Sequence, residues 1–576
     1  MDHVRASNAE GIGSPQPCSQ QAAAAEDAIT TKSLGSRIKS FFASGAQRNA
    51  GKSPKASVAA RGGALLAGFL VVGVAMTGCS GNGGGTAATG AAYTKDTVTF
   101  ATSVVPPSLN PAVGDPAYAP LYHWAYDPLV IMNGDGSFSP GLAEKFGYVG
   151  KGNQTYELTL REGLKFSDGA VLDAKALKEN LDYTRSQTLG TATTLLAAVK
   201  NVEVTDPRTV RLTLSRPDPG LTFYFAQAFG AGYPISPKSL DKPATLDAAT
   251  AGAGPYMLDP AETVAGDHYT FVKNPNYWNP ERQHFESVTV RVIANPSSTI
   301  QAIQAGQVQA ALGDPTTLSA ARAANLQVVA PPQALTGINL ADREGTKSEP
   351  LGNVKVRQAL NMAVDRKAIA KALYGSEDLA LSQYALEGQV PYSEELNEKY
   401  PYDPEKAKAL LAEAGYPDGF TLPVLTTSLA SLDKLTRAVA GQLEQVGVKL
   451  ELTTQAAAPD YFTAMVSGKY PAAVIGYGLA DMNTLWAGFV NKAGPFNFFK
   501  TVDPELDDLY NQYRVADQEA GAALQKKINE RLMDQAWTIP VVGAPLSYYI
   551  APGLTGFDAT SANAGVPLVT DLRPAK

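Results

Sequence analysis

The sequence predicts a mixed α/β protein with two or three large domains, and three observations lead to this prediction. Its 576 residues, 44% of them hydrophobic and 18% charged, suffice for several separate cores in an ordinary globular composition. Short segments of alternating apolar and polar residues between positions 97 and 215 are typical of β-strands. Longer amphipathic segments between positions 354 and 536 are typical of helices, and both kinds in one chain indicate an α/β architecture.

The strand-like segments come first. Residues 97–102, TVTFAT, are rich in β-branched residues and predict a strand. Residues 155–169 predict two short strands, with a turn marked by Asp168-Gly169. Residues 200–215 predict two further strands on either side of a turn at Asp206-Pro207.

Four segments predict helices, each with a start or stop signal. Residues 172–187 contain a candidate N-cap, Asp173. Residues 354–375 form one amphipathic pattern that stops at a glycine, which predicts a single helix. Residues 403–420 have a proline at the first helical position and a glycine stop. Residues 505–536 predict one or two long helices.

The beginning of the chain differs in charge from the rest. Residues 1–78 carry a net charge of +4 and the remaining residues carry −11. A basic leader is typical of a targeting segment, and the acidic body argues against a nucleic-acid partner. The uncharged run at 64–75 fits the apolar region of a signal peptide, because spanning a bilayer takes about 20 residues. The leader is longer than such a signal needs, and Val58 is an alternative start.

The junction MTGC, Met76 to Cys79, resembles the bacterial lipobox, in which the cysteine receives diacylglycerol and becomes the new N-terminus. We therefore expect Cys79 to be a lipid anchor. The alternative, a cysteine buried in a core, fits poorly with the following SGNGGGTAATG, which has no apolar periodicity. The expected segments are a disordered leader at 1–63, the apolar region and lipobox at 64–78, and a flexible tether at 79–95.

Four motifs, taken in order, resemble family 5 of the bacterial extracellular solute-binding proteins, the peptide- and nickel-type receptors of ABC importers. The motifs are TYELTLREGLKFSDGAVLDAKAL from Thr155, AGAGPYMLDP with FVKNPNYW from Ala251, VKVRQALNMAVDR from Val354, and YPYDPEKAKALLAEAGYPDGF from Tyr400. The resemblance runs from about Asp96 to the C-terminus. We expect these motif residues to shape the scaffold rather than to contact a ligand.

The resemblance implies two α/β lobes of the periplasmic-binding-protein type, in the large three-domain class II variant. Hinge strands join the lobes, which close over a ligand between them. The first lobe is expected at 96–336, with an extra subdomain at about 127–245. The second lobe is expected at 337–539, and the chain returns to the first lobe at 540–576.

The resemblance also implies a position for the ligand's charge. In the peptide-binding members, a carboxylate in a segment W-x-A-D-x-N pairs with the peptide's α-ammonium group, since an unpaired buried charge is costly. The segment VIGYGLADMNTLW, from Val474, offers Asp481, with Gly478 at the position of the aromatic residue. The alternative role for Asp481 is a helix N-cap.

Four further residues are expected at the ligand. Tyr477, Asn483 and Trp486 lie close to Asp481 in the sequence and could line the pocket, and Trp124 could face it from the first lobe. Burial in a core is the alternative for both tryptophans.

Enzymatic function is not expected. The chain has no nucleophile elbow of the G-x-S-x-G kind, and its four histidines lack metal-ligand spacing. These histidines are His3, His123, His268 and His284. We therefore predict no catalytic residue, no metal and no cofactor.

The expected function is that of a monomeric, lipid-anchored receptor on the extracytoplasmic face of a Gram-positive-type cell membrane. It would capture di- or oligopeptides and deliver them to an ABC permease and its ATPase. Two alternatives remain open. The same fold could serve as a regulatory or scaffold protein of the cell envelope, or the importer could take up an oligosaccharide or a metal chelate.

Overall fold

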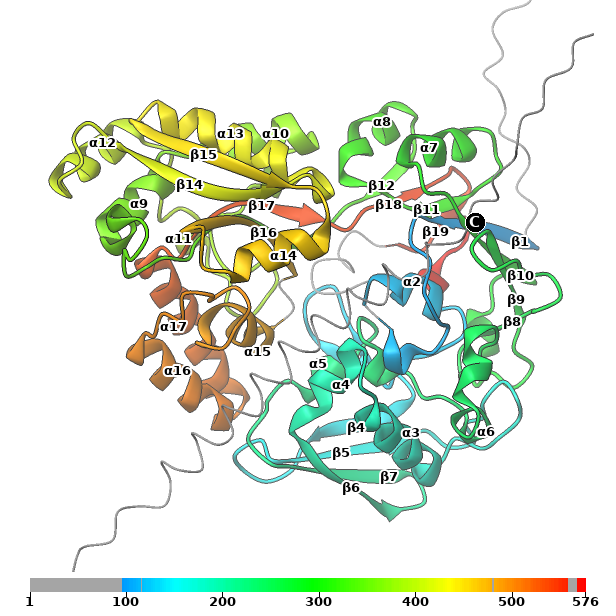
Figure 1. Cartoon of the computed structure of the whole chain (residues 1–576). Coiled ribbons are helices and arrows are strands. Elements are labelled where there is room, and N and C mark those ends of the chain that lie inside the picture. Colours follow the sequence, from blue (N-terminus) through cyan, green and yellow to red (C-terminus); the bar gives the residue numbers. More distant parts are fainter. Residues whose placement is uncertain (1–95, 115, 479–480, 558–566, 576) are drawn as a thin grey trace, which may run out of the picture. The chain divides into compact units, whose positions relative to one another are not determined.

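The computed structural model describes residues 96–114, 116–478, 481–557 and 567–575 (Figure 1). The predicted leader, signal region, tether and Cys79 lie outside the described residues. Within the ranges given, no helix combines the length and apolar character needed to cross a membrane.

A seven-stranded sheet contains the first predicted strand. Its order is β12-β18-β11-β1-β10-β9-β8, and β1 (Thr97–Thr102) runs parallel to both of its neighbours. The strand prediction for 97–102 is therefore confirmed, at the centre of the sheet. The other strands are β8 (Tyr256–Leu258), β9 (His268–Lys273), β10 (Ser287–Val292), β11 (Ala310–Leu312), β12 (Gln327–Val329) and β18 (Tyr548–Ile550). Helices α7 (Pro296–Gln304) and α8 (Leu318–Ala323) follow β10 and β11.

A four-stranded antiparallel sheet, in the order β4-β5-β7-β6, has its own core. Its strands are β4 (Ala143–Tyr148), β5 (Thr155–Leu160), β6 (Val199–Asp206) and β7 (Thr209–Leu214). Alternate residues of β5 are buried beneath α3 (Ala174–Ser186), as the period of two requires. Asp173 caps α3 by accepting a hydrogen bond from the Ala176 amide at 2.9 Å, so the predicted helix and its cap are confirmed.

The prediction of two strands within residues 155–169 is only half right. β5 forms, but beyond it there is one isolated bridge between Lys165 and Val171. Asp168-Gly169 makes the turn inside that bridge, and Gly169 has φ of 81°, which favours glycine. The predicted turn is confirmed. The second predicted strand is wrong, because the residues on either side of the turn pair at one position only.

A five-stranded sheet, in the order β15-β14-β16-β13-β17, supports the largest core. Its strands are β13 (Pro332–Leu340), β14 (Phe420–Thr427), β15 (Val448–Gln455), β16 (Ala472–Gly478) and β17 (Thr538–Pro545). β14 runs parallel to β15 and β16, and β13 runs antiparallel to β16 and β17. Helix α13 (Leu432–Glu444) packs on this sheet through Leu435, Val439 and Leu443.

The helices associated with the five-stranded sheet confirm two predictions and correct one. Residues 354–375 are two helices, α9 (Val354–Met362) and α10 (Arg366–Tyr374), and the single-helix prediction is wrong. Asp365 starts α10 by accepting from the Ala368 amide at 2.9 Å, and Gly375 ends it with φ of 74°. The others are α12 (Pro404–Glu413), which follows its predicted start, and the pair α16 (Pro504–Val515) and α17 (Gln518–Gln535).

The chain passes twice between the seven-stranded and the five-stranded sheet. One passage joins β12 to β13 and the other joins β17 to β18, each through two residues. The two passages are neighbours, because the Leu546 amide donates to the Pro331 carbonyl at 3.1 Å. Two short adjacent connections of this kind can serve as a hinge.

Candidate functional site

The end of β16 positions Asp481. This residue is the N-cap of the short helix α15 (Met482–Leu485), and its Oδ1 accepts from the Thr484 amide at 2.9 Å. The Thr484 hydroxyl accepts from the Asp481 amide at 3.2 Å, which completes a capping box. Oδ2 accepts from the Asn483 side chain at 3.1 Å. An ionised carboxylate can accept about four hydrogen bonds, so the capping role leaves capacity for a further donor.

Aromatic side chains surround the Asp481 segment. Trp486 stacks on Tyr510 of α16 with ring centroids 4.0 Å apart and an angle of 3° between the planes. The Tyr510 hydroxyl donates to Asn483 Oδ1 at 3.2 Å. Tyr477 donates to the Thr484 carbonyl at 2.5 Å. The structure therefore brings Tyr477, Asn483 and Trp486 together around Asp481.

Tyr477 also has a packing role. Its ring meets Phe489 and Phe496 edge to face, with centroids 4.7 and 5.1 Å apart. The motif W-x-A-D-x-N has its aromatic residue at position 478, where this chain has the exposed Gly478. The aromatic residue of this segment is Tyr477, one position earlier.

A loop from the four-stranded-sheet part reaches the same place. A Cβ added at Gly220 would lie 2.8 Å from Asn483 Nδ2 and 2.4 Å from the Tyr224 ring, so the backbone of this loop touches the Asp481 segment closely. Asp218 lies in the loop, between β7 and α5 (Leu221–Tyr224), and its Oδ1 accepts from the Gly220 amide at 3.0 Å.

Sequence reasoning missed Asp218, Tyr224 and Tyr510. The sequence of the loop, RPDPGLTFY from Arg216, is typical of an ordinary turn. Tyr510 lies in a segment that predicts a helix, and nothing distinguishes it there from residues on the helix surface. The available signal was the Asp-Pro-Gly turn followed directly by aromatic residues, but nothing in it pointed to a site more than 250 positions away.

Both carboxylates have a raised pKa, and burial is the main cause in each case. The pKa of Asp481 is raised to about 6, mainly by burial and also by the Asp218 charge, while its hydrogen bonds to Thr484 partly oppose this rise. Burial raises the pKa of Asp218 as well, although Arg216 and Arg514 partly oppose this. Each carboxylate is therefore less stable in its charged form than it would be in water, and a cation between them would relieve that cost.

Tyr224 and Tyr510 share this environment. Burial raises the pKa of both hydroxyls, and the charges of Asp481 and Asp218 raise it further. Both groups are consequently neutral near neutral pH, and the Tyr510 hydroxyl uses its one hydrogen in the bond to Asn483 Oδ1.

Trp124 lies elsewhere. It is fully buried in the core of the seven-stranded-sheet part, edge to face with Phe100 and Tyr256 at centroid distances of 6.5 and 5.8 Å. The structure does not bring it together with Asp481. Its indole Nε1 is buried without a hydrogen-bond partner in the described ranges.

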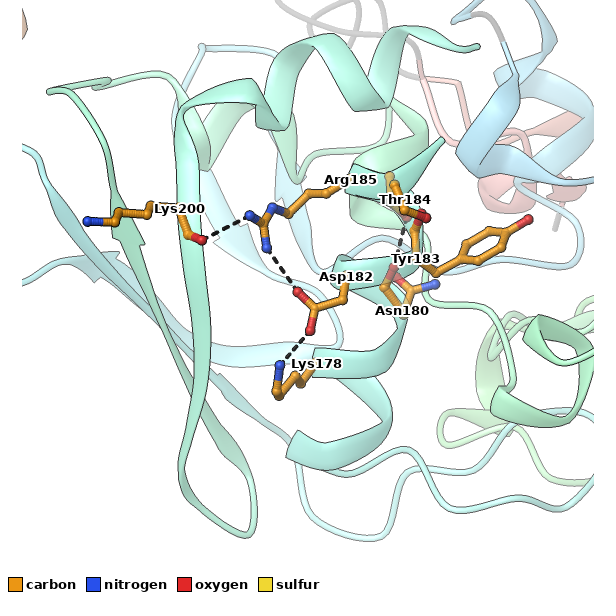
Figure 2. Close-up of polar contacts among 8 residues, drawn as sticks. Lys178, Asn180, Asp182, Tyr183, Thr184, Arg185 and Lys200 are labelled. Carbon is orange, nitrogen blue, oxygen red and sulfur yellow. Dashed lines mark hydrogen bonds and ion pairs between the residues drawn. The ribbon is translucent and has the colours of Figure 1, made fainter. Parts of the chain in front are cut away.

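A hollow of about 520 Å³ beside α3 is a weaker candidate for a site. Figure 2 shows why: Lys178 and Arg185 both pair with Asp182, and Arg185 also donates to the Lys200 carbonyl at 3.0 Å. Such pairs three and four residues apart are ordinary features of an exposed helix surface. For the part of the chain that the structure covers, no group of three or more His, Cys, Asp or Glu side chains is arranged to hold a metal ion.

Comparisons with known proteins agree on one family. The model of bacterial extracellular solute-binding proteins, family 5 Middle, matches residues 137–495. The chain is 30% identical over 457 residues to the glutathione-binding protein GsiB of Salmonella paratyphi A, covering 75% of this chain and 86% of the relative. It is 29% identical over 495 residues to heme-binding protein A of Haemophilus influenzae, covering 78% and 88%.

A solved structure shows the same fold. NikA from Brucella suis, in complex with Fe(III)-EDTA, superposes with a TM-score of 0.72 at 24% identity, covering 83% of this chain and all of that one. The predicted two-lobe α/β fold is thereby confirmed, with the seven- and four-stranded sheets and the five-stranded sheet as its main parts.

Proposed function

The chain belongs to family 5 of the bacterial extracellular solute-binding proteins, and from this premise we propose that it captures peptides with a free α-ammonium group. Members of the family are the extracytoplasmic substrate-binding components of ABC importers. The peptide's ammonium group lies beside Asp481, with Asp218 facing it from the other lobe. Asn483, Tyr477, Trp486 and Tyr510 form the polar and aromatic surroundings of the same position.

The observation that carries the proposal is the pair of half-buried carboxylates from two lobes. A carboxylate that is desolvated and faces a second one gains most from a cationic partner. The relative named as a glutathione-binding protein supports a small peptide, because glutathione is a tripeptide with a free α-ammonium group. Heme, which the other relative's name mentions, carries two propionates that this pair would repel.

Delivery and attachment complete the proposal. The closed, loaded receptor docks on an ABC permease, whose ATPase drives import. Cys79 carries the lipid that holds the receptor at the outer face of the cell membrane; the support for this is the MTGC junction in the sequence. We propose that the receptor acts as a monomer.

The substitution Asp481→Asn tests the amine site. It keeps the shape and capping ability of the side chain and removes the charge. Removing one partner of a desolvated ion pair costs about 2–5 kcal/mol, which corresponds to roughly thirtyfold to several-thousandfold in affinity. The measurement is calorimetric titration with a peptide that co-purifies with the protein and with its N-acetylated form.

The acetylated peptide is the matched control. Wild type should bind the free amine far more tightly than the acetylated form, and Asp481→Asn should lose most of that preference. Equal affinity of wild type for the two forms would exclude an amine site here and favour an oligosaccharide or a chelate as ligand.

A further inference from the structure

A second contact between the lobes lies beside the site and uses different atoms. The side-chain amide of Asn153, in the loop between β4 and β5, donates to the carbonyls of Arg514 and Ala516 at 3.0 and 2.9 Å. In return, Nε of Arg514 donates to the Pro217 carbonyl at 3.1 Å. Each lobe therefore both donates and accepts, and the acceptors are backbone carbonyls throughout.

The geometry of each partner explains why the contact forms. Arg514 and Ala516 lie at the end of α16, where the last carbonyls of a helix have no partner within the helix. The side-chain amide of Asn153 satisfies two carbonyls there. On the opposite side, the Asp218 amide donates to the Asn153 carbonyl at 3.1 Å, which ties the two contacting loops of the first lobe into one surface.

The same helix connects this contact to the ligand site. Tyr510 and Arg514 are four residues apart on α16, so their side chains are neighbours, with the guanidinium 5.9 Å from the ring centroid of Tyr510. Tyr510 in turn bonds Asn483, which bonds Asp481. Movement of α16 away from the first lobe would therefore disturb the contact and the site together.

We propose that Asn153 and Arg514 form an interlobe latch that stabilises the closed receptor independently of the ligand. The latch consists of chain atoms alone, so it biases the equilibrium between open and closed forms before any ligand binds. Because it touches backbone carbonyls rather than the ligand, it acts in the same way for every ligand that the site accepts. This inference rests on the two-lobe fold and not on the identity of the ligand.

Asn153→Gly removes the latch with little disturbance of the fold. Asn153 has φ of 51°, in the left-handed region that glycine adopts freely, so the change deletes only the side chain. Asn325→Gly is the matched control, because Asn325 has φ of 56° and is exposed, and its side chain makes no hydrogen bond recorded for the described residues. Arg514→Lys is a second test that keeps the charge and removes the Nε donor.

The measurement is the distance between two spin labels in the ligand-free protein. Cys18 and Cys79 are replaced by serine in the full chain, and single cysteines replace the exposed Glu203 on β6 and Glu519 on α17. Wild type should show a population at short distance. Asn153→Gly and Arg514→Lys should reduce the ratio of closed to open forms by about threefold to thirtyfold, the range expected for one or two hydrogen bonds.

The outcomes are distinct. Asn325→Gly should match wild type in both the distance distribution and the melting temperature. Equal distributions for wild type, Asn153→Gly and Arg514→Lys would overturn the latch, as would a wild type without any short-distance population. Since no peptide is present, failure of the amine site at Asp481 would leave this result unaffected.

Discussion

Asp481 caps α15, and in the proposed function the same side chain also pairs with the ligand's ammonium group. Its carboxylate caps α15 through one oxygen and accepts from Asn483 through the other, which fixes its position without using all of its acceptor capacity. Asp218 is held in a similar way by the Gly220 amide. Both carboxylates are therefore positioned in advance, and this reduces the ordering cost of binding.

The raised pKa values predict how affinity depends on pH. A protonated carboxyl group cannot pair with an ammonium group, so affinity should fall as the pH drops below about 6, where Asp481 takes up a proton. Each carboxylate that must ionise contributes about tenfold per pH unit. Above about pH 8 the peptide's own amine deprotonates, so affinity should be constant between the two limits.

Calorimetric titrations from about pH 4.5 to pH 7.5 measure this dependence. Since the pKa of Asp218 is also raised, the wild-type slope at the acid end should exceed one proton, and Asp218→Asn should reduce it. The ligand-free protein should behave oppositely. Asp481 binds its proton more tightly when folded, so stability should fall as the pH rises from about 4 to about 6. Affinity that is constant across the whole range would contradict the assignment.

At the scale of elements, local sequence signals predicted where helices begin and end better than whether a helix continues without a break. The caps at Asp173 and the stop at Gly375 were readable from the sequence, because each involves neighbouring residues only. The break between α9 and α10 was not readable, because the amphipathic pattern continues through it. At the break, the Asp365 amide donates to the Gln442 side chain at 2.7 Å, a tertiary contact that no local pattern contains.

The break between α9 and α10 leads to a stability prediction. Asp365→Ala removes the acceptor for the Ala368 amide and should cost about 0.5–2 kcal/mol, as loss of an N-cap does. Ligand affinity should remain unchanged. Differential scanning calorimetry measures the stability change. Asp508→Ala is the control, since Asp508 is exposed and, among the residues that the structure describes, bonds only the Gln512 side chain. Equal melting curves for the two variants would show that Asp365 does not stabilise the start of α10.

At the scale of the whole molecule, the expected site residues that the structure brings together all come from one lobe. A motif resemblance pointed to Asp481 and Asn483, and Trp486 was expected beside them because it lies close in the sequence. Asp218 and Asn153 belong to loops of the other lobe, and only the folded chain brings them to α15 and α16. For Trp124 the sequence left both the cleft and a core open, because a large aromatic residue fits either, and the structure shows it in a core.

The proposed attachment at Cys79 leads to the last prediction. If the MTGC junction is processed as a lipobox, the receptor's membrane affinity comes from acyl chains, at about 0.8 kcal/mol per buried methylene. Cys79→Ala should then release the protein into the medium or leave an unprocessed precursor, whereas deletion of residues 2–57 should change neither processing nor attachment. Cell fractionation with mass spectrometry of the mature N-terminus distinguishes these outcomes. A Cys79→Ala protein that matures and stays on the membrane like wild type would show that something other than this thiol attaches it.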